Sequence, residues 1–328
     1  MSKRIWITWE KQRRNHTLSK ALNAQLFQFD LKLNRFVRYP FLLLRTLFTF
    51  IKEKPILIFV QNPSMVLTLF AINYGKLFNI PIIVDAHNAG INPFEGTKWW
   101  ANRIVDYLIR EATITIVTNK YLEEHVYRKG GQPFILPDPI PSFPSYYNLE
   151  IKKKLKGKHN IFYICTYAKD EPYLEVIKAA RLFKNDIYIY ISGNSKGKAR
   201  KFKDILPPNI ILTGYLHEKE YFELLCSCDV IVDLTTRKDC LVCGAYEAIA
   251  VEKPLIISDS EISRHYFNKG VLYTDNTCVN LAEQINKAII NISSLREEIR
   301  TLKVQLITEW EDLRISFEKE ILNLLSKY

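Results

Sequence analysis

Residues 239–259 read DCLVCGAYEAIAVEKPLIISD. This order of residue types predicts a loop, the start of an apolar helix, a Lys-Pro turn and a short buried strand. Open N–H groups at a helix start attract phosphate, and Gly244, followed by Ala245, lets a ligand approach the backbone closely. Glu247, one turn into the helix, can accept hydrogen bonds from a vicinal diol. Two acids spaced like Asp239 and Glu247 are also typical of a solvated helix face or a helix cap.

The rest of the chain alternates apolar strands with amphipathic helices, which indicates doubly wound parallel sheets of the α/β class. Strands are expected at residues 4–9, 56–60, 81–85, 113–117, 134–136, 160–165, 187–192, 210–212, 230–233, 255–258 and 271–273. Helices are expected in the first half at residues 18–23, 39–52, 65–78, 99–111 and 120–129, and at the end of the chain at residues 295–325. Prolines interrupt residues 136–148, which predicts a linker between domains at 1–147 and 148–305, followed by a final helix at 306–328.

Basic residues exceed acidic ones, 46 against 35, and the formal net charge is +11. The excess lies before residue 56, and between residues 35 and 54 it is mixed with aromatic and aliphatic side chains. This mixture favours a helix on an anionic lipid surface. Nucleic acid is the competing partner, and a half-buried helix with a basic edge is a third interpretation.

The apolar runs fall well short of the ~20 residues that a membrane-spanning helix needs, and the opening residues have no signal-peptide pattern. We therefore expect a cytoplasmic protein without a transmembrane segment. The six cysteines do not form paired zinc knuckles, which favours free thiols.

Two further motifs follow expected strands: QNP at residues 61–63 and VDAHN at residues 84–88. Together with residues 239–247, they resemble GT-B glycosyltransferases of the family 4 type, and also the dolichol-linked chitobiose mannosyltransferases. The resemblance implies two Rossmann-like domains that face each other across a cleft, the first for the acceptor and the second for a nucleotide-sugar donor. It also implies that the final helix crosses back onto the first domain.

The resemblance assigns roles by position. Asp239 would face the donor hexose as a catalytic residue, and Glu247 would hold the nucleotide ribose. His87 would donate a hydrogen bond to a sugar hydroxyl, with Asp85 either orienting it or capping the next turn. Further candidates are Gly193, Gly214, Gly244 and Ala245 for the nucleotide, and Asn62 and Asn88 for the acceptor.

Two loops depart from the family pattern. Residues 9–15, WEKQRRN, have no glycine, so Arg13 and Arg14 are expected to bind an acceptor diphosphate unless they lie on a solvated loop. Residues 165–172, CTYAKDEP, lack the family's basic pair for the donor diphosphate. The counter-charges expected in its place are Lys169, Arg237 and Lys238.

The combined expectation is transfer of a hexose from a UDP- or GDP-linked sugar to a glycan or polyprenyl-linked acceptor, in cell-surface glycan assembly at the inner face of the membrane. The resemblance to family 4 implies retention at the anomeric carbon, which is expected here, whereas the chitobiose mannosyltransferases invert it. Independence of metal and cofactor is also expected, because no D-x-D metal motif is evident. The alternatives are a sugar-nucleotide 2-epimerase of GT-B fold and a basic nucleic-acid-binding protein. A dehydrogenase is disfavoured, because neither half opens with G-x-G-x-x-G.

Overall fold

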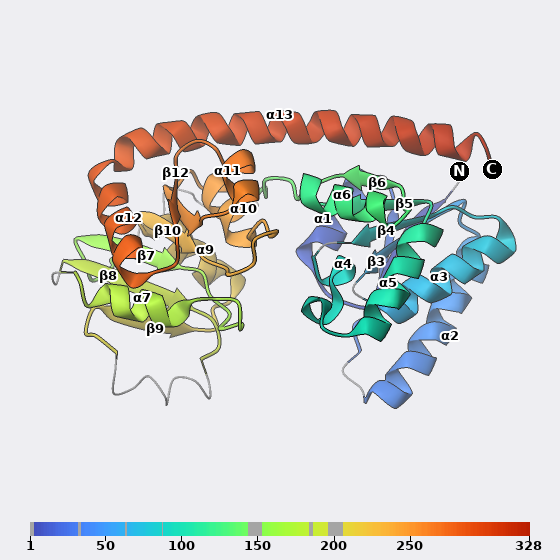
Figure 1. The fold of residues 1–328 in the computed structure, drawn as a ribbon, viewed down its shortest axis with the longest axis horizontal. Coiled ribbons are helices and arrows are strands. Elements are labelled where there is room, and N and C mark those ends of the chain that lie inside the picture. The colour runs from blue at the N-terminus through green and yellow to red at the C-terminus, as the bar shows by residue number, and fades with distance from the viewer. Residues whose placement is uncertain are drawn as a thin grey trace. The chain divides into compact units, whose positions relative to one another are not determined.

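The computed structural model describes residues 3–31, 34–62, 64–86, 88–143, 153–183, 186–195 and 206–328. The chain divides into two compact units: unit 1 comprises Met1–Asp138 with Glu309–Tyr328, and unit 2 comprises Pro139–Thr308. Each unit is built on a six-stranded parallel sheet with helices on both faces (Figure 1). The expected α/β class with two doubly wound units is confirmed.

The sheet of unit 1 has the strand order β2-β1-β3-β4-β5-β6. Its strands are β1 (Arg4–Thr8), β2 (Gln25–Gln28), β3 (Leu57–Asn62), β4 (Ile82–Ala86), β5 (Ile114–Val117) and β6 (Pro133–Ile135). The helices are α1 (Arg13–Ala21), α2 (Arg35–Glu53), α3 (Met65–Phe78), α4 (Asn88–Ile91), the 3-10 helix η1 (Pro93–Gly96), α5 (Trp99–Glu111) and α6 (Lys120–Arg128). All six residues of β3 are buried, as expected for a parallel strand that helices cover on both sides.

Helices α2, α3, α5 and α6 cover one face of this sheet and share a core that includes Phe50 and Leu67. Helix α1 and the last part of α13 (Ile292–Leu325) cover the other face, against Trp6 and Phe59. Helices on both faces allow the strands to be apolar throughout, which is why these strands could be recognised in the sequence.

The last part of α13 belongs to unit 1. Trp310 donates its indole N–H to the carbonyl oxygen of Pro137 at 3.0 Å, and the ring centroid of Phe317 lies 4.3 Å from that of Phe134. Arg4 forms an ion pair with Glu318 at 2.7 Å. These contacts confirm that the final helix returns to the first domain, and they show that Trp310 anchors it there.

The sheet of unit 2 has the strand order β12-β11-β10-β7-β8-β9. Its strands are β7 (His159–Tyr163), β8 (Ile187–Ser192), β9 (Ile210–Gly214), β10 (Val230–Asp233), β11 (Leu255–Ser258) and β12 (Val271–Thr274). Its helices are α7 (Tyr173–Ala180), α9 (Glu218–Ser227), α10 (Cys243–Ala250), α11 (Glu261–Tyr266), α12 (Cys278–Ile290) and the first part of α13. Helices α7 and α12 pack on one face, while α9, α10 and α13 pack on the other.

The sequence expectations miss β2. Its residues QLFQ are exposed or half-buried at the edge of the sheet, so they lack the apolar run that marks the inner strands. Helix α2 begins at Arg35, before the expected residue 39, because the side chain of Asn34 accepts the backbone N–H of Phe36 and caps the helix. No helix in the described ranges is long and apolar enough to span a membrane.

Candidate functional site

The site in unit 2 is built at the carboxyl end of β10, where Asp233 ends the strand and α10 begins nearby. The backbone N–H of Gly244 donates to Asp233 Oδ2 at 2.7 Å. A Cβ at residue 244 would lie 2.5 Å from that oxygen and 2.6 Å from Cδ1 of Ile164. The missing side chain of Gly244 therefore makes room for the carboxylate of Asp233. This corrects the prediction that it makes room for a ligand.

Burial strongly disfavours the charged form of Asp233 and raises its pKa well above the ordinary value. The hydrogen bond from Gly244 opposes this shift, while the negative charges of Glu171, Glu247 and Asp170 increase it. Asp233 was not among the predicted site residues, although an acid that ends the apolar strand VIVD is a recognisable signal.

Asp233→Asn should reduce the pH dependence of stability. Above about pH 4, where an unfolded aspartate titrates, folded Asp233 still holds a proton that the unfolded chain has lost. The free energy of unfolding of the wild type therefore falls as pH rises toward the raised pKa. Asparagine keeps an oxygen acceptor for Gly244 and does not ionise, so the variant should gain stability relative to the wild type between pH 5 and pH 8 in thermal unfolding.

Asp259→Asn is the matched control, because the pKa of Asp259 is shifted in the opposite direction. A hydrogen bond from Arg264 lowers it. That carboxylate contributes stability above its unfolded pKa and loses it on acidification, so the control should change in the opposite direction and by less at this exposed site. A pH profile of Asp233→Asn that parallels the wild type would contradict the proposed protonation of Asp233.

Glu247 lies one turn into α10 and is half-buried. Its carboxylate accepts a hydrogen bond from the hydroxyl of Tyr221 on α9. The Tyr221 ring packs edge-on against Phe162 of β7, with 5.4 Å between the ring centroids. The orientation of the Glu247 carboxylate is thus set by a neighbouring helix and the sheet, a contact that no sequence motif signals.

The loop after β7 is organised by Glu171. Its carboxylate accepts the backbone N–H groups of Thr166 at 2.9 Å and Ala168 at 2.8 Å, and the Thr166 hydroxyl at 2.8 Å. Tyr167 between them has a positive φ of 60°, so the two N–H groups point to the same anion. That anion is the carboxylate of Glu171, a group of the protein itself. Lys169 in this loop is exposed, which leaves its ammonium group accessible.

The loop after β10 carries the other expected counter-charges. Arg237 forms an ion pair with Asp170 at 3.3 Å and keeps a side chain that is 40% exposed. Lys238 is exposed and Asp239 is half-buried. The hydroxyl of Thr235 also donates to Asp170 at 3.0 Å, so the loops after β7 and β10 are held together.

The small residues predicted to contact the nucleotide differ in what surrounds them. A Cβ at Gly193 would lie 2.2 Å from the carbonyl oxygen of Cys165, so this glycine, with φ of 97°, is required by internal packing. Gly214 has φ of 73° and faces open space, and it keeps its predicted access to a ligand. The side chain of Ala245 is fully buried in the core.

In unit 1, Arg14 is buried and its guanidinium group is fully engaged. It donates to Asp85 through Nε and Nη2 at 2.8–3.1 Å, to Asp138 at 2.9 Å and to the carbonyl oxygen of Leu136 at 2.9 Å. Burial opposes its charge, but Asp85 and Asp138 outweigh that effect and raise the pKa of Arg14. The predicted role of Arg14 in acceptor binding is therefore corrected to a structural ion pair, and Asp85 is the partner of Arg14.

Two other predicted residues of unit 1, Arg13 and Asn62, lie at the carboxyl edge of the same sheet. Arg13 is exposed at the start of α1. Asn62 is buried and donates a hydrogen bond to the carbonyl oxygen of Gly90 at 3.0 Å, so it fixes α4. Because its side chain is buried, it does not contact the acceptor substrate, which corrects that prediction. His87 and the side chain of Asn88 lie outside the described residues.

Side chains replace glycines in the first loop of unit 1. Gln61 accepts from Thr8 at 2.6 Å and from Asn15 at 2.8 Å, and it donates to Gln12. These bonds connect the ends of β1 and β3 to the start of α1. They explain how the loop WEKQRRN keeps its shape without a glycine.

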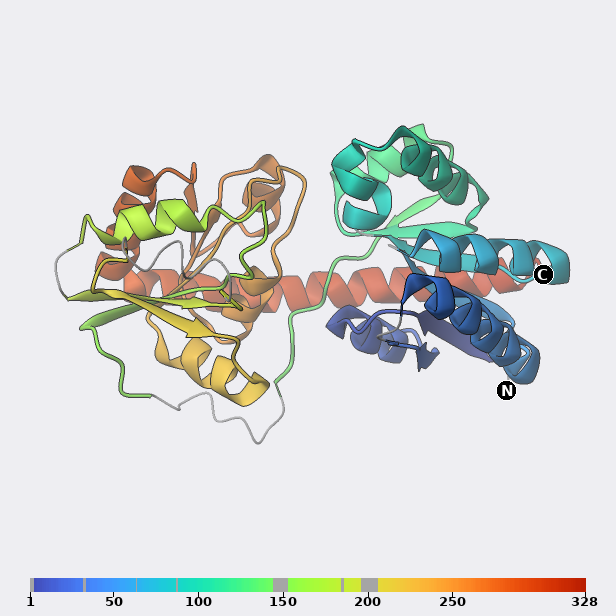
Figure 2. The same ribbon diagram turned by 90° about the horizontal axis from the view of Figure 1, so that it is seen from below.

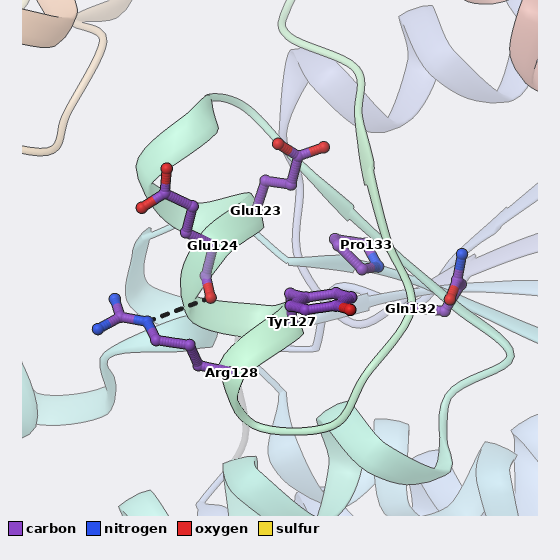
Figure 3. A pocket seen from close by; sticks show the side chains of 6 residues that line it. All are labelled: Glu123, Glu124, Tyr127, Arg128, Gln132 and Pro133. Atoms are coloured by element: carbon purple, nitrogen blue, oxygen red, sulfur yellow. Dashed lines mark hydrogen bonds between the residues drawn. The ribbon is translucent and has the colours of Figure 1, made fainter.

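A surface hollow of about 600 Å³ lies on α6 and the adjoining edge of the sheet (Figure 3). The residues that line it are Glu123, Glu124, Tyr127, Arg128, Gln132 and Pro133. None of the predicted site residues lines this hollow. The charged residues predicted to bind the donor in unit 2 lie instead in the loops that follow β7 and β10 and in α10.

Residues 148–302, most of unit 2, match the model of the glycosyl transferases group 1 family. The whole chain has the fold of the GT-B glycosyltransferases, and residues 148–302 resemble the group 1 family of these enzymes.

Known structures share the fold at low sequence identity. Sucrose-phosphate synthase from Thermosynechococcus elongatus is 13% identical over the whole of both chains, with a TM-score of 0.77. Anabaena HepE in complex with UDP and glucose is 11% identical over the whole of both chains, with a TM-score of 0.72. MnaA of S. aureus in complex with UDP is 14% identical over 92% of each chain, with a TM-score of 0.62. No curated protein matches the sequence.

Proposed function

We propose that the protein transfers a hexose from a UDP- or GDP-linked sugar to a glycan or polyprenyl-linked acceptor in cell-surface glycan assembly. The observation that carries the proposal is the geometry of Glu247, which lies one turn into α10 within the group 1 domain and is oriented by Tyr221. A carboxylate fixed near a helix start suits a ribose diol beside a diphosphate. The HepE structure with UDP and glucose supports a nucleotide-sugar donor.

In this proposal the donor binds to unit 2. Glu247 holds the ribose, Asp239 faces the hexose, and Gly214 leaves room for the nucleotide. The exposed Lys169 and Lys238, with Arg237, stabilise the diphosphate as it leaves with the electron pair of the broken anomeric bond. The acceptor hydroxyl oxygen forms the new bond to the anomeric carbon, and its proton passes to an oxygen of the departing diphosphate.

The acceptor binds to unit 1 in this proposal. Arg13 and Asn88 contact the acceptor, and His87 donates a hydrogen bond to a hydroxyl of the donor sugar. We propose retention at the anomeric carbon, as the resemblance to family 4 implies. We also propose catalysis without metal or cofactor, through positioning and electrostatic stabilisation.

A sugar-nucleotide 2-epimerase is the second candidate. The observation that favours it is the similarity of the fold to a putative UDP-N-acetylglucosamine 2-epimerase from Listeria monocytogenes, with a TM-score of 0.57. Such an enzyme needs one nucleotide site and no acceptor, so the requirement for an acceptor separates the two functions.

Incubation with UDP-glucose, UDP-N-acetylglucosamine and GDP-mannose, each with and without a polyprenyl-diphosphate-linked saccharide, tests both. We expect release of a nucleoside diphosphate from one donor and a lengthened saccharide, both dependent on the acceptor. An epimerised nucleotide sugar formed from donor alone would identify the epimerase and reject the transferase.

We also propose an anionic membrane surface as a partner of α2, on the inner face. Phe36 is 82% exposed and Leu44 and Phe48 are each 67% exposed, beside the exposed basic residues Lys52 and Lys54. An amphipathic basic helix of this kind suits anionic lipid, and about 1 kcal/mol is available for each basic residue near the surface. A lipid-linked acceptor would be presented at the same membrane.

A further inference from the structure

Three exposed aromatic side chains lie between α4 and the first turn of α5. Phe94 is 57% exposed, Trp99 is 70% exposed and Trp100 is 45% exposed. The rings of Phe94 and Trp100 contact each other, with 5.8 Å between their centroids. We call these three residues the aromatic cluster. Aromatic rings contribute most to stability when they are buried, so three neighbouring rings left in solvent indicate a contact surface.

The backbone beneath the cluster is held in a strained shape. Phe94 has φ of 51°, in the left-handed region that a bulky residue rarely adopts. Thr97 donates its backbone N–H at 3.1 Å and its hydroxyl at 2.7 Å to the carbonyl oxygen of Phe94. Asn102 of α5 donates to the carbonyl oxygen of Gly96 at 2.8 Å. These hydrogen bonds fix the backbone that carries the Phe94 ring, and the ring itself stays exposed. This arrangement points to a role of the ring outside the folded core.

Other exposed apolar side chains lie at the starts of helices on the same face of unit 1. Helices α2, α3 and α5 lie in that order across one face of unit 1 (Figure 2), with Phe50 of α2 against Tyr74 of α3. Each helix follows a parallel strand, so all three begin at the carboxyl edge of the sheet. Val66 and Leu69 in the first turns of α3 are also partly exposed, and they extend the apolar edge between the other two helices.

The charges around the cluster favour an anionic partner. Lys98 and Arg103 are exposed on either side of the two tryptophans, against one acid, Glu95, between residues 92 and 105. Tryptophan next to basic side chains is typical of the headgroup level of a bilayer. A surface that stacks on saccharides needs polar groups around its rings, whereas the neighbouring exposed residues of α3 are aliphatic.

We propose that the aromatic cluster inserts into the headgroup region of an anionic bilayer and forms a second membrane contact beside α2. The proposal rests on the membrane partner in the proposed function and extends it to α5. Two contacts on separate helices would fix the orientation of unit 1 on the lipid surface, whereas a single helix leaves the unit free to rotate about the helix axis.

Intrinsic fluorescence provides a direct test, because the five tryptophans differ in exposure. Trp6, Trp9 and Trp310 are buried, so a change in emission on binding reports Trp99 and Trp100. Vesicles of phosphatidylcholine with phosphatidylglycerol should shift the emission to the blue, and brominated lipid should quench it. Vesicles of phosphatidylcholine alone should have a much smaller effect.

The double variant Trp99→Ala, Trp100→Ala should lose the spectral response and bind anionic vesicles at least about tenfold more weakly. The variant Trp99→Phe, Trp100→Phe keeps the apolar rings and should restore vesicle binding in co-sedimentation. Ile290→Ala is the matched control, since this exposed apolar residue lies in unit 2 and its loss should not change binding.

Co-sedimentation of the wild type without a blue shift or bromine quenching would overturn the cluster as a contact and leave α2 as the membrane-binding element. A blue shift with a soluble acceptor saccharide, but not with vesicles, would identify a sugar-stacking surface and also overturn the proposal. Transfer to a soluble acceptor, measured in the same variants, should be unchanged. Its absence in the wild type would reject the proposed function instead, whatever the fluorescence shows.

Discussion

Arg14→Ala is expected to lower the free energy of unfolding by about 3–5 kcal/mol, because it leaves a buried carboxylate without its counter-charge. Asp85 is fully buried at the end of β4, and Arg14 is its charged partner at 2.8 Å. Urea unfolding followed by tryptophan fluorescence measures this effect. All five tryptophans belong to unit 1, so the signal reports the unit that contains the ion pair.

Asp138→Asn removes the other carboxylate that contacts Arg14. Its side chain is 31% exposed, so a loss of about 1 kcal/mol or less is expected there. Adding Asp85→Asn to Arg14→Ala should recover part of the stability, since the buried charge is then removed. An effect of Arg14→Ala no larger than that of Asp138→Asn would show that the buried pair contributes little.

Glu247→Ala is expected to abolish transfer and to weaken binding of the nucleoside diphosphate. Loss of a charged hydrogen-bonding group is typically equivalent to about 1.5–3 kcal/mol, so the dissociation constant should rise roughly 10- to 100-fold. Calorimetric titration with UDP and with GDP measures it, and an unchanged melting temperature shows that the fold survives.

Tyr221→Phe is the control for Glu247→Ala. It removes the hydroxyl that orients the carboxylate but keeps the ring packed against Phe162, so a smaller loss of affinity is expected. Wild-type affinity of Glu247→Ala for the nucleoside diphosphate would contradict the ribose-binding role. Glu247 would then be an ordinary residue of the helix.

The strands could be predicted because apolar runs such as residues 187–192 and 255–258 are needed wherever helices cover both faces of a parallel sheet. The edge strand β2 could not, because its half-buried residues share no such pattern. Helix ends were harder, since caps such as Asn34 depend on a single side chain.

The placement of Asp239 in a loop and of Glu247 in the helix that follows could be predicted, because both residues lie in one short stretch of sequence. The site was not predictable where the decisive contact joins distant parts of the chain. Arg14 meets Asp85, 71 positions away, and Tyr221 meets Glu247, 26 positions away. The sequence alone therefore predicts that Arg13 and Arg14 form an open anion site. Only the structure shows that the buried carboxylate of Asp85 binds Arg14.

The composition of unit 1 from two distant chain segments affects how the protein is made. A ribosome that has completed residue 138 must still synthesise all of unit 2 before residues 309–328 emerge. At about 5–20 residues per second, this delay is on the order of 10–30 s. During that time the face formed by Trp6 and Phe59 lacks Phe317 and Ile321 of the final helix. The nascent first unit therefore exposes apolar surface during this time, and the emergence of residues 309–328, rather than synthesis of the first half, completes unit 1.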